Sequence, residues 1–204
     1  MRTRLLSEGL TLSQVTSQIR RTLGVKAAIL PLTDERVETR LNIADKEVSF
    51  QEYFVKERWQ PEVTKVFYVG VEESKPAPGV LDAIRSATGI VICPSNPVTS
   101  IGPILAVPGI RDALKETSAT VVGVSPIIGA SAITGPAHKL MSASGWEVSA
   151  LGVAQAYADF LDVFVVANED QRLKAQIAEL NGKTVAMNIR MDDLSKRVRE
   201  LEWQ

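Results

Sequence analysis

The chain has a single cysteine, Cys93, among 204 residues, and its formal net charge is only −1. One cysteine cannot form an internal disulfide, so a disulfide framework is excluded and a reducing compartment is expected. The near-zero net charge excludes a protein that binds nucleic acid mainly through bulk electrostatics. Cys93 ends an apolar run, and we expect it to be a small core residue rather than a nucleophile.

Long hydrophobic runs are also missing. No apolar run approaches the roughly 18 residues that a membrane-spanning helix needs. The N-terminal stretch MRTRLLSEGLTLSQ carries two arginines but lacks the apolar core of a signal peptide. These absences predict a cytoplasmic protein with neither a membrane nor a nucleic-acid partner.

The composition itself, 45% hydrophobic and 23% charged, is that of a globular protein. A chain of this length can bury roughly 70% of its unfolded surface, so it needs no metal or disulfide for stability. We find no internal repeat, low-complexity segment or dividing linker. The prediction is therefore one α/β domain over residues 1–204.

The first part of the chain shows two helix starts and an alternating strand. Thr11 with Gln14, and Ser49 with Glu52, have the spacing of capping boxes, which predicts helices from 12 to Gly24 and over 50–58. Residues 36–43 alternate apolar and charged side chains, as a half-buried strand does. Short strands are also predicted, and these cover residues 25–32 and 65–71.

The second part alternates buried strands with helices. Continuous apolar runs predict strands at 89–94, 120–126 and 163–168, each covered on both faces. Such alternation favours a three-layer, Rossmann-like α/β fold with a mostly parallel central sheet. The residues near 36–49 add a small antiparallel excursion. The last predicted elements are a helix at 169–180, the turn Asn181-Gly182, a strand at 183–189 and a helix that contains Leu194, Val198 and Leu201.

Three loops follow the buried strands, at residues 94–103, 125–136 and 167–171. Ligands of open α/β sheets bind beyond the carboxyl ends of the strands, which is where these loops lie. The first two loops combine hydroxyls, an amide, glycines and prolines. Prolines stiffen a loop, and neutral donors with exposed backbone N–H groups can hold a phosphate. The alternative is that Ser-Pro and Gly-Pro simply mark the ends of strands.

Several longer motifs resemble one known family. They are PSNPVTSIGPILAVPGIRDAL, VVGVSPIIG, SALGVAQAYADFLDVFVV, PLTDERVETRL and FQEYFVKER. Together they resemble the 2-phospho-L-lactate transferase family of coenzyme F-420 biosynthesis, from about residue 2 to residue 190. Members of that family begin with a glycine-rich strand-loop-helix, so the chain is expected to correspond to the C-terminal two-thirds of a member.

The resemblance implies a reaction. A 2-phospholactyl or phosphoenolpyruvyl group, carried as a guanosine diphosphate ester, is joined to the deazaflavin precursor of coenzyme F-420. GMP is released, Mg²⁺ is required, and the enzyme is expected to be a homodimer. The residues do not decide between the lactyl and enolpyruvyl donors, and neither a catalytic residue nor a metal ligand is assigned. The alternative function is a non-catalytic nucleotide- or nucleotide-sugar-binding regulatory protein of related fold.

The nucleotide site is predicted in the first two loops. Ile101, Ile104 and Leu105 are expected to point into the sheet and anchor the first loop. Asp34, in PLTDERVETRL, has two open interpretations, an active-site acid or a residue bonded within a local turn. The residues predicted to line the guanosine pocket are Ser95, Asn96, Ser100, Gly102, Ser125, Gly129 and Gly135.

Overall fold

The structure is a computed structural model, and it describes residues 1–129, 131–132, 135–180 and 183–189. These residues form two compact units, which we describe one at a time. The first consists of Met1–Thr88 and Val98–Ala119, and the second of Gly89–Pro97 and the described residues from Thr120 onward. Two compact units can form one domain or two, so the single domain predicted over residues 1–204 stays a prediction.

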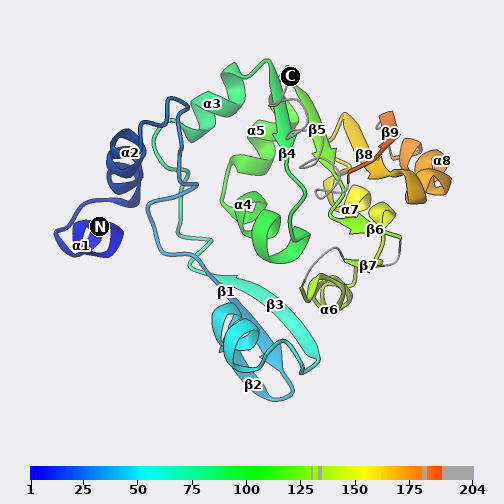
Figure 1. Cartoon of the computed structure of the whole chain (residues 1–204), viewed down its shortest axis with the longest axis horizontal. Helices are drawn as coiled ribbons and strands as arrows, with labels where there is room; N and C mark the ends of the chain where they lie inside the picture. The colour runs from blue at the N-terminus through cyan, green and yellow to red at the C-terminus, as the bar shows by residue number, and fades with distance from the viewer. Residues whose placement is uncertain (130, 133–134, 181–182, 190–204) are drawn as a thin grey trace, which may run out of the picture. The chain divides into compact units, whose positions relative to one another are not determined.

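The second unit is built on a parallel sheet of four strands. The strands are β4 (Gly89–Ile92), β5 (Thr120–Val124), β8 (Val163–Ala167) and β9 (Lys183–Met187). They are hydrogen-bonded in the order β4-β5-β8-β9, and every pair is parallel (Figure 1). The predicted α/β fold with a mostly parallel sheet is confirmed.

Helices of the second unit lie between the strands in sequence. A helix predicted at 169–180 begins instead as a 3-10 helix, η3, before it becomes the short α-helix α8. In the unit's core, Tyr157 and Phe164 are among the largest fully buried side chains. The helical segments are α6 (Ala137–Ala143), α7 (Ala150–Tyr157), η3 (Asn168–Leu173) and α8 (Lys174–Ala178).

Strand β4 is less covered than its apolar sequence predicted. Val91, in the middle of the strand, keeps 62% of its surface exposed, and Cys93 just beyond the strand is also exposed. The expectations of a strand covered on both faces and of a core cysteine were therefore wrong. β4 stands at one end of the four-strand order, where only one neighbouring strand pairs with it.

The first unit contains a small antiparallel sheet. Its strands are β1 (Glu38–Ile43), β2 (Lys46–Ser49) and β3 (Val63–Val69), in the order β2-β1-β3. This sheet confirms the antiparallel excursion predicted near residues 36–49. Side chains alternate along β1, with Leu41 and Ile43 buried, as the apolar–charged pattern indicated.

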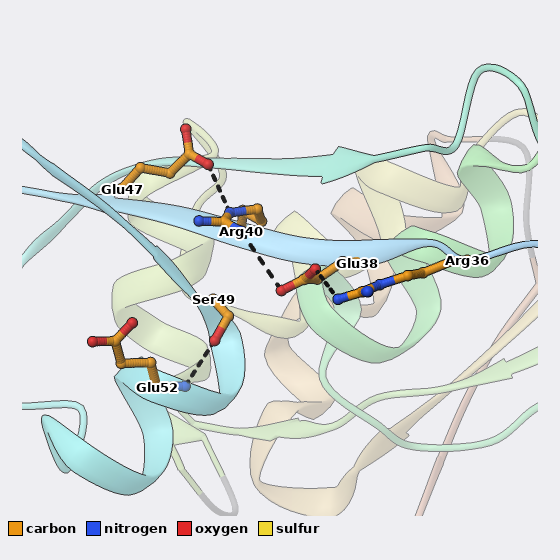
Figure 2. Close-up of polar contacts among 6 residues, drawn as sticks. All are labelled: Arg36, Glu38, Arg40, Glu47, Ser49 and Glu52. Atoms are coloured by element: carbon orange, nitrogen blue, oxygen red, sulfur yellow. Dashed lines mark hydrogen bonds and ion pairs between the residues drawn. The ribbon is translucent and has the colours of Figure 1, made fainter. Parts of the chain in front are cut away.

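Both predicted capping sites start helices in the first unit. The Thr11 hydroxyl accepts from Gln14 N–H at 3.3 Å, and the Gln14 side chain accepts from Thr11 N–H at 2.9 Å, at the start of α2 (Leu12–Thr22). The Ser49 hydroxyl accepts from Glu52 N–H at 3.0 Å at the start of η1 (Glu52–Lys56), a π-helical segment (Figure 2). The unit also has α1 (Arg2–Ser7) and α3 (Val80–Ser86).

The strand predicted at residues 25–32 does not form. After α2 the chain continues without regular structure, and the side chains of residues 23–30 are exposed. The Arg20 guanidinium donates to the carbonyls of Val25, Lys26 and Ala27 at 3.0–3.3 Å. These carbonyls therefore bond to a side chain rather than to a neighbouring strand.

The first predicted loop, residues 94–103, is largely helical from Pro97 onward, which corrects the expectation of a stiff loop without regular structure. It forms η2 (Pro97–Ile101) and then α4 (Gly102–Ala106), and α5 (Ile110–Glu116) follows. A proline fits the first turn of a helix, because its missing N–H has no intrahelical acceptor there. Pro103 occupies such a position in α4. Prolines read as loop stiffeners in this sequence thus also start helices.

Two predicted elements lie outside the described residues. They are the turn Asn181-Gly182 and the helix that contains Leu194, Val198 and Leu201. Within the described ranges, no helix has both the length and the apolar character to cross a membrane.

Candidate functional site

The candidate site is the carboxyl edge of the parallel sheet. Residues 93–97 follow β4, residues 125–129 follow β5 and residues 168–170 follow β8, and these three strands are neighbours. Since parallel strands end at the same edge, the three segments emerge together there. Ser95 and Asn96, predicted from sequence, belong to the first of these segments, and both are half-buried.

The segment after β5 forms a compact turn. Ser125 is fully buried, and its N–H donates to the Val165 carbonyl of β8 at 2.9 Å. Its hydroxyl donates to the Ile127 carbonyl at 2.8 Å and accepts from Ile127 N–H at 3.1 Å. The hydroxyl predicted to line a nucleotide pocket thus makes its hydrogen bonds within its own turn. A direct contact of Ser125 with a ligand stays a prediction, whereas its role in shaping the turn is visible.

A small hairpin continues this turn. Strand β6 (Ile127–Ile128) pairs antiparallel with β7 (Ser131–Ala132). Gly129 has φ +65°, a left-handed conformation that glycine adopts without strain, and a Cβ added there would meet nothing within 4 Å. Gly135 has φ +69° and precedes the buried Pro136 at the start of α6. Both glycines therefore serve turns beyond the end of β5.

A buried carboxylate, which the sequence did not single out, belongs to the same edge. Asp170 lies in η3, directly after β8, and has 0% exposure. Both of its carboxylate oxygens accept from Gly129 N–H, at 3.1 and 2.9 Å. The only sequence signal was its place in the loop 167–171, after the third buried strand. Its partner, 41 residues earlier, could not be read from the sequence.

Two other predicted site residues belong to the first unit. Ser100 lies in η2 and is half-buried, and Gly102 is the first residue of α4. Gly102 does not have a positive φ, so the backbone there does not itself require glycine. Ile101 is buried, as an anchor should be, but Ile104 has 40% of its surface exposed, which corrects the expectation that it anchors the loop.

Tyr68 of β3 holds this helical segment. Its hydroxyl donates to the carbonyl of Val98 in η2, and Val98 itself is 2% exposed. Burial raises the pKa of Tyr68 to about 12 from an ordinary value of 10.0, because the interior disfavours the phenolate. No sequence pattern indicates this contact, since 30 residues separate the partners.

The raised pKa of Tyr68 predicts a loss of stability at high pH. An unfolded tyrosine ionises near pH 10.0, whereas folded Tyr68 keeps its proton until about pH 12. Between these values the unfolded state binds fewer protons, so the stabilisation is complete below pH 10.0 and is lost as pH rises toward about 12. Tyr68→Phe should make the urea midpoint fall less steeply in this window. Parallel curves for the wild type and the variant would refute the assignment.

The structure gives Asp34 a structural partner. Its carboxylate accepts from Ser13 N–H at 2.6 Å, in the first turn of α2. An acidic group at this position satisfies a free N–H and complements the positive end of the helix dipole. Of the two interpretations, hydrogen bonding to backbone is the one seen, although the partner is 21 residues away rather than in a local turn.

The charged side chains along β1 and β2 form ion pairs with one another. Arg40 lies between Glu47, at 2.6 Å from its Nε, and Glu38, at 3.8 Å from its guanidinium, and Arg36 pairs with Glu38 at 3.0 Å (Figure 2). These groups are part-exposed, and exposed pairs of this kind contribute about 0–1 kcal/mol each. We therefore assign them no role in the site.

Metal-binding side chains do not gather in the described part of the chain. Among those residues, no group of three or more His, Cys, Asp or Glu side chains could hold a metal ion. Asp170 and Asp34 each accept from backbone N–H groups instead. At the carboxyl edge, the Ser125 hydroxyl and the Gly129 N–H already have partners within the chain.

A parallel sheet whose carboxyl edge carries polar, glycine-containing turns defines a Rossmann-like α/β protein. Within that class, a family model described as "2-phospho-L-lactate transferase CofD" matches residues 1–203. The chain belongs to this CofD family.

Relatives within the family carry two names. The chain is 44% identical over 171 residues to the 2-phospho-L-lactate transferase of Methanosarcina mazei, covering 84% of this chain and 56% of that protein. It is 41% identical over 199 residues to the phosphoenolpyruvate transferase of Streptomyces griseus, covering 95% of this chain and 63% of that protein. The chain thus spans less than two-thirds of the length of these relatives.

A solved structure supports the fold. The chain matches a protein of the UPF0052 family from Bacillus halodurans with a TM-score of 0.62 and 21% sequence identity. The match covers 92% of this chain and 62% of that protein. At this identity the likeness concerns the fold alone.

Proposed function

We propose that this chain is a CofD-type transferase that binds the nucleotide of its donor. The donor is a guanosine diphosphate ester of lactate or of enolpyruvate, and the acceptor is the deazaflavin precursor of coenzyme F-420. Family membership over residues 1–203 supports the reaction class, and relatives named for each donor support the two alternatives.

One observation carries the proposal to this chain. The segments after β4 and β5, which hold Ser95, Asn96 and the turn from Ser125 to Gly129, emerge at one edge of a parallel sheet. Short polar side chains and backbone donors at such an edge can bind a diphosphate by hydrogen bonds, without a dense cluster of lysines. Ser100, Gly102 and Gly135, which the sequence also predicted as nucleotide-binding residues, stay predictions.

The proposed reaction is a displacement at phosphorus. A hydroxyl oxygen of the acceptor forms a new bond to the phosphorus that carries the acid, and the bond from that phosphorus to the GMP oxygen breaks. The acceptor hydroxyl loses its proton, and GMP leaves. The protein holds the nucleotide so that the acceptor oxygen attacks in line with the bond that breaks. Holding the two reactants in this orientation lowers the entropic part of the reaction barrier.

Mg²⁺ is part of the proposal through the family resemblance. The described residues do not offer a cluster of metal-binding side chains. We therefore assign the ion no ligand in this chain and derive no step from it. A homodimer and a cytoplasmic location likewise stay predictions.

The proposal is tested by two measurements on the same chain. Calorimetry should show GDP binding, and incubation with either donor ester and the deazaflavin should release GMP only when the acceptor is present. The full-length Methanosarcina mazei relative serves as the positive control for the assay. A chain that neither binds GDP nor releases GMP would refute the proposal.

The same pair of measurements separates the alternative function. A regulatory nucleotide-binding protein should bind GDP, or another nucleotide, and release no GMP with either donor. Activity with one donor and not the other would decide between the lactyl and enolpyruvyl esters.

A further inference from the structure

Two aspartates tie the two ends of β5 to the chain around β8. Asp162, just before β8, accepts from Val121 N–H at 2.8 Å near the amino end of β5. Asp170, just after β8, accepts from Gly129 N–H beyond the carboxyl end of β5. In each case the carboxylate meets a backbone N–H 41 residues earlier in the chain.

We propose that Asp170 is a positioning residue for the nucleotide turn, defined as residues 125–129, and that it acts through Gly129. This inference rests on the proposed function, because it assumes that the turn faces the nucleotide. Asp162 clamps the opposite end of the same strand and should have no such effect.

The geometry explains why Asp170 is placed to act on the turn. The Ser125 N–H and hydroxyl fix the beginning of the turn against β8 and Ile127. Asp170 fixes its far end, where Gly129 takes a left-handed φ of +65°. A Cβ at Gly129 would meet nothing within 4 Å, so packing does not hold this end. The hydrogen bond to Asp170 is the contact seen to hold Gly129.

The burial of Asp170 makes the contact costly to replace. Its exposure is 0%, and a buried carboxylate must be satisfied by donors because water does not reach it. Gly129 N–H is such a donor, and both carboxylate oxygens lie within 3.1 Å of it. The Gly129 N–H is thus bonded to Asp170, so we expect a phosphate to bind other donors at the carboxyl edge of the sheet. The role of Asp170 is to set the shape that presents them.

The test compares Asp170→Ala with Asp162→Ala in the whole chain. Asp170→Ala should weaken GDP binding by about tenfold, because the turn loses the hydrogen bond that holds its far end and no longer presents its donors in one fixed shape. Asp162→Ala should change GDP affinity less than about twofold, because its clamp lies at the other edge of the sheet. Asp170→Asn keeps an oxygen acceptor in the same place and should recover most of the affinity. Equal GDP affinity for Asp170→Ala and the wild type would overturn the proposal, as would Asp170→Asn binding as weakly as Asp170→Ala.

Amide hydrogen exchange provides a readout that does not depend on GDP. Asp170→Ala should speed exchange in residues 125–129 by about tenfold or more, while Asp162→Ala should leave that turn unchanged. Faster exchange with no GDP binding by the wild type would mean that the clamp is real and the proposed function is wrong. Unchanged exchange in Asp170→Ala would show that the hydrogen bond between Asp170 and Gly129 does not hold the turn.

Discussion

Gly152→Ala is expected to destabilise the chain by about 3 kcal/mol. Gly152 lies in the first turn of α7, where its N–H donates to the Ser149 hydroxyl at 3.1 Å. A Cβ at this position would fall inside the backbone of Glu147, with the carbonyl carbon at 2.9 Å and the carbonyl oxygen closer still. Backbone cannot rotate away as a side chain can, so the start of α7 must shift.

Urea unfolding of Gly152→Ala measures this effect, with Gly89→Ala as the matched control. Gly89 opens β4, and a Cβ there meets only the Thr120 carbonyl oxygen at an ordinary 4.0 Å. The control should therefore stay within about 1 kcal/mol of the wild type. Equal stability of the two variants would show that the close packing at Glu147 is not real.

Ser125→Ala is expected to lower the free energy of unfolding by about 2–4 kcal/mol, because two hydrogen bonds are lost where water does not replace them. The hydroxyl both donates to and accepts from Ile127, and Ser125 has 0% exposure. The damage falls on the turn after β5, so GDP affinity should fall together with stability.

Ser86→Ala is the control for this substitution. The Ser86 hydroxyl also donates to a backbone carbonyl, that of Asp82 at 2.7 Å, but it is exposed. Water replaces such a contact, so the loss should be within about 0.5 kcal/mol in urea unfolding. If Ser125→Ala is as mild as Ser86→Ala, the turn is not held by this hydroxyl.

Local patterns in the sequence predicted the elements whose causes are local. The capping spacing of Thr11 and Gln14 and the alternation over 36–43 both correspond to observed structure. The apolar runs at β5 and β8 became buried parallel strands. In each case the residues that determine the element lie within it.

The errors arose where composition alone does not determine the local structure. Residues 25–32 have the composition of a strand, but Arg20 bonds to their carbonyls. Pro97 and Pro103 were read as loop residues, whereas they lie in the first turns of η2 and α4. Composition alone does not distinguish a proline that stiffens a loop from one that begins a helix.

The site was predicted only in outline. Position after buried strands located Ser95, Asn96 and the turn at Ser125 on one edge of the sheet. The contact that holds the turn, Asp170 to Gly129, joins residues 41 positions apart, and the contact of Tyr68 with Val98 in η2 joins residues 30 positions apart. No spacing in one sequence reveals such pairs, because they depend on how the strands are ordered.

The central claim is that the carboxyl edge of the parallel sheet binds a guanosine nucleotide, and a GDP titration of Asn96→Ala tests it most directly. Asn96 follows β4 at that edge, and Gln155→Ala, which removes an exposed amide from α7, is the control. We expect Asn96→Ala to weaken GDP binding by about 1–3 kcal/mol, or roughly 5- to 150-fold, while the control binds as the wild type does. If the wild type binds GDP and a folded Asn96→Ala binds it equally well, the carboxyl edge does not bind the nucleotide and the account is contradicted.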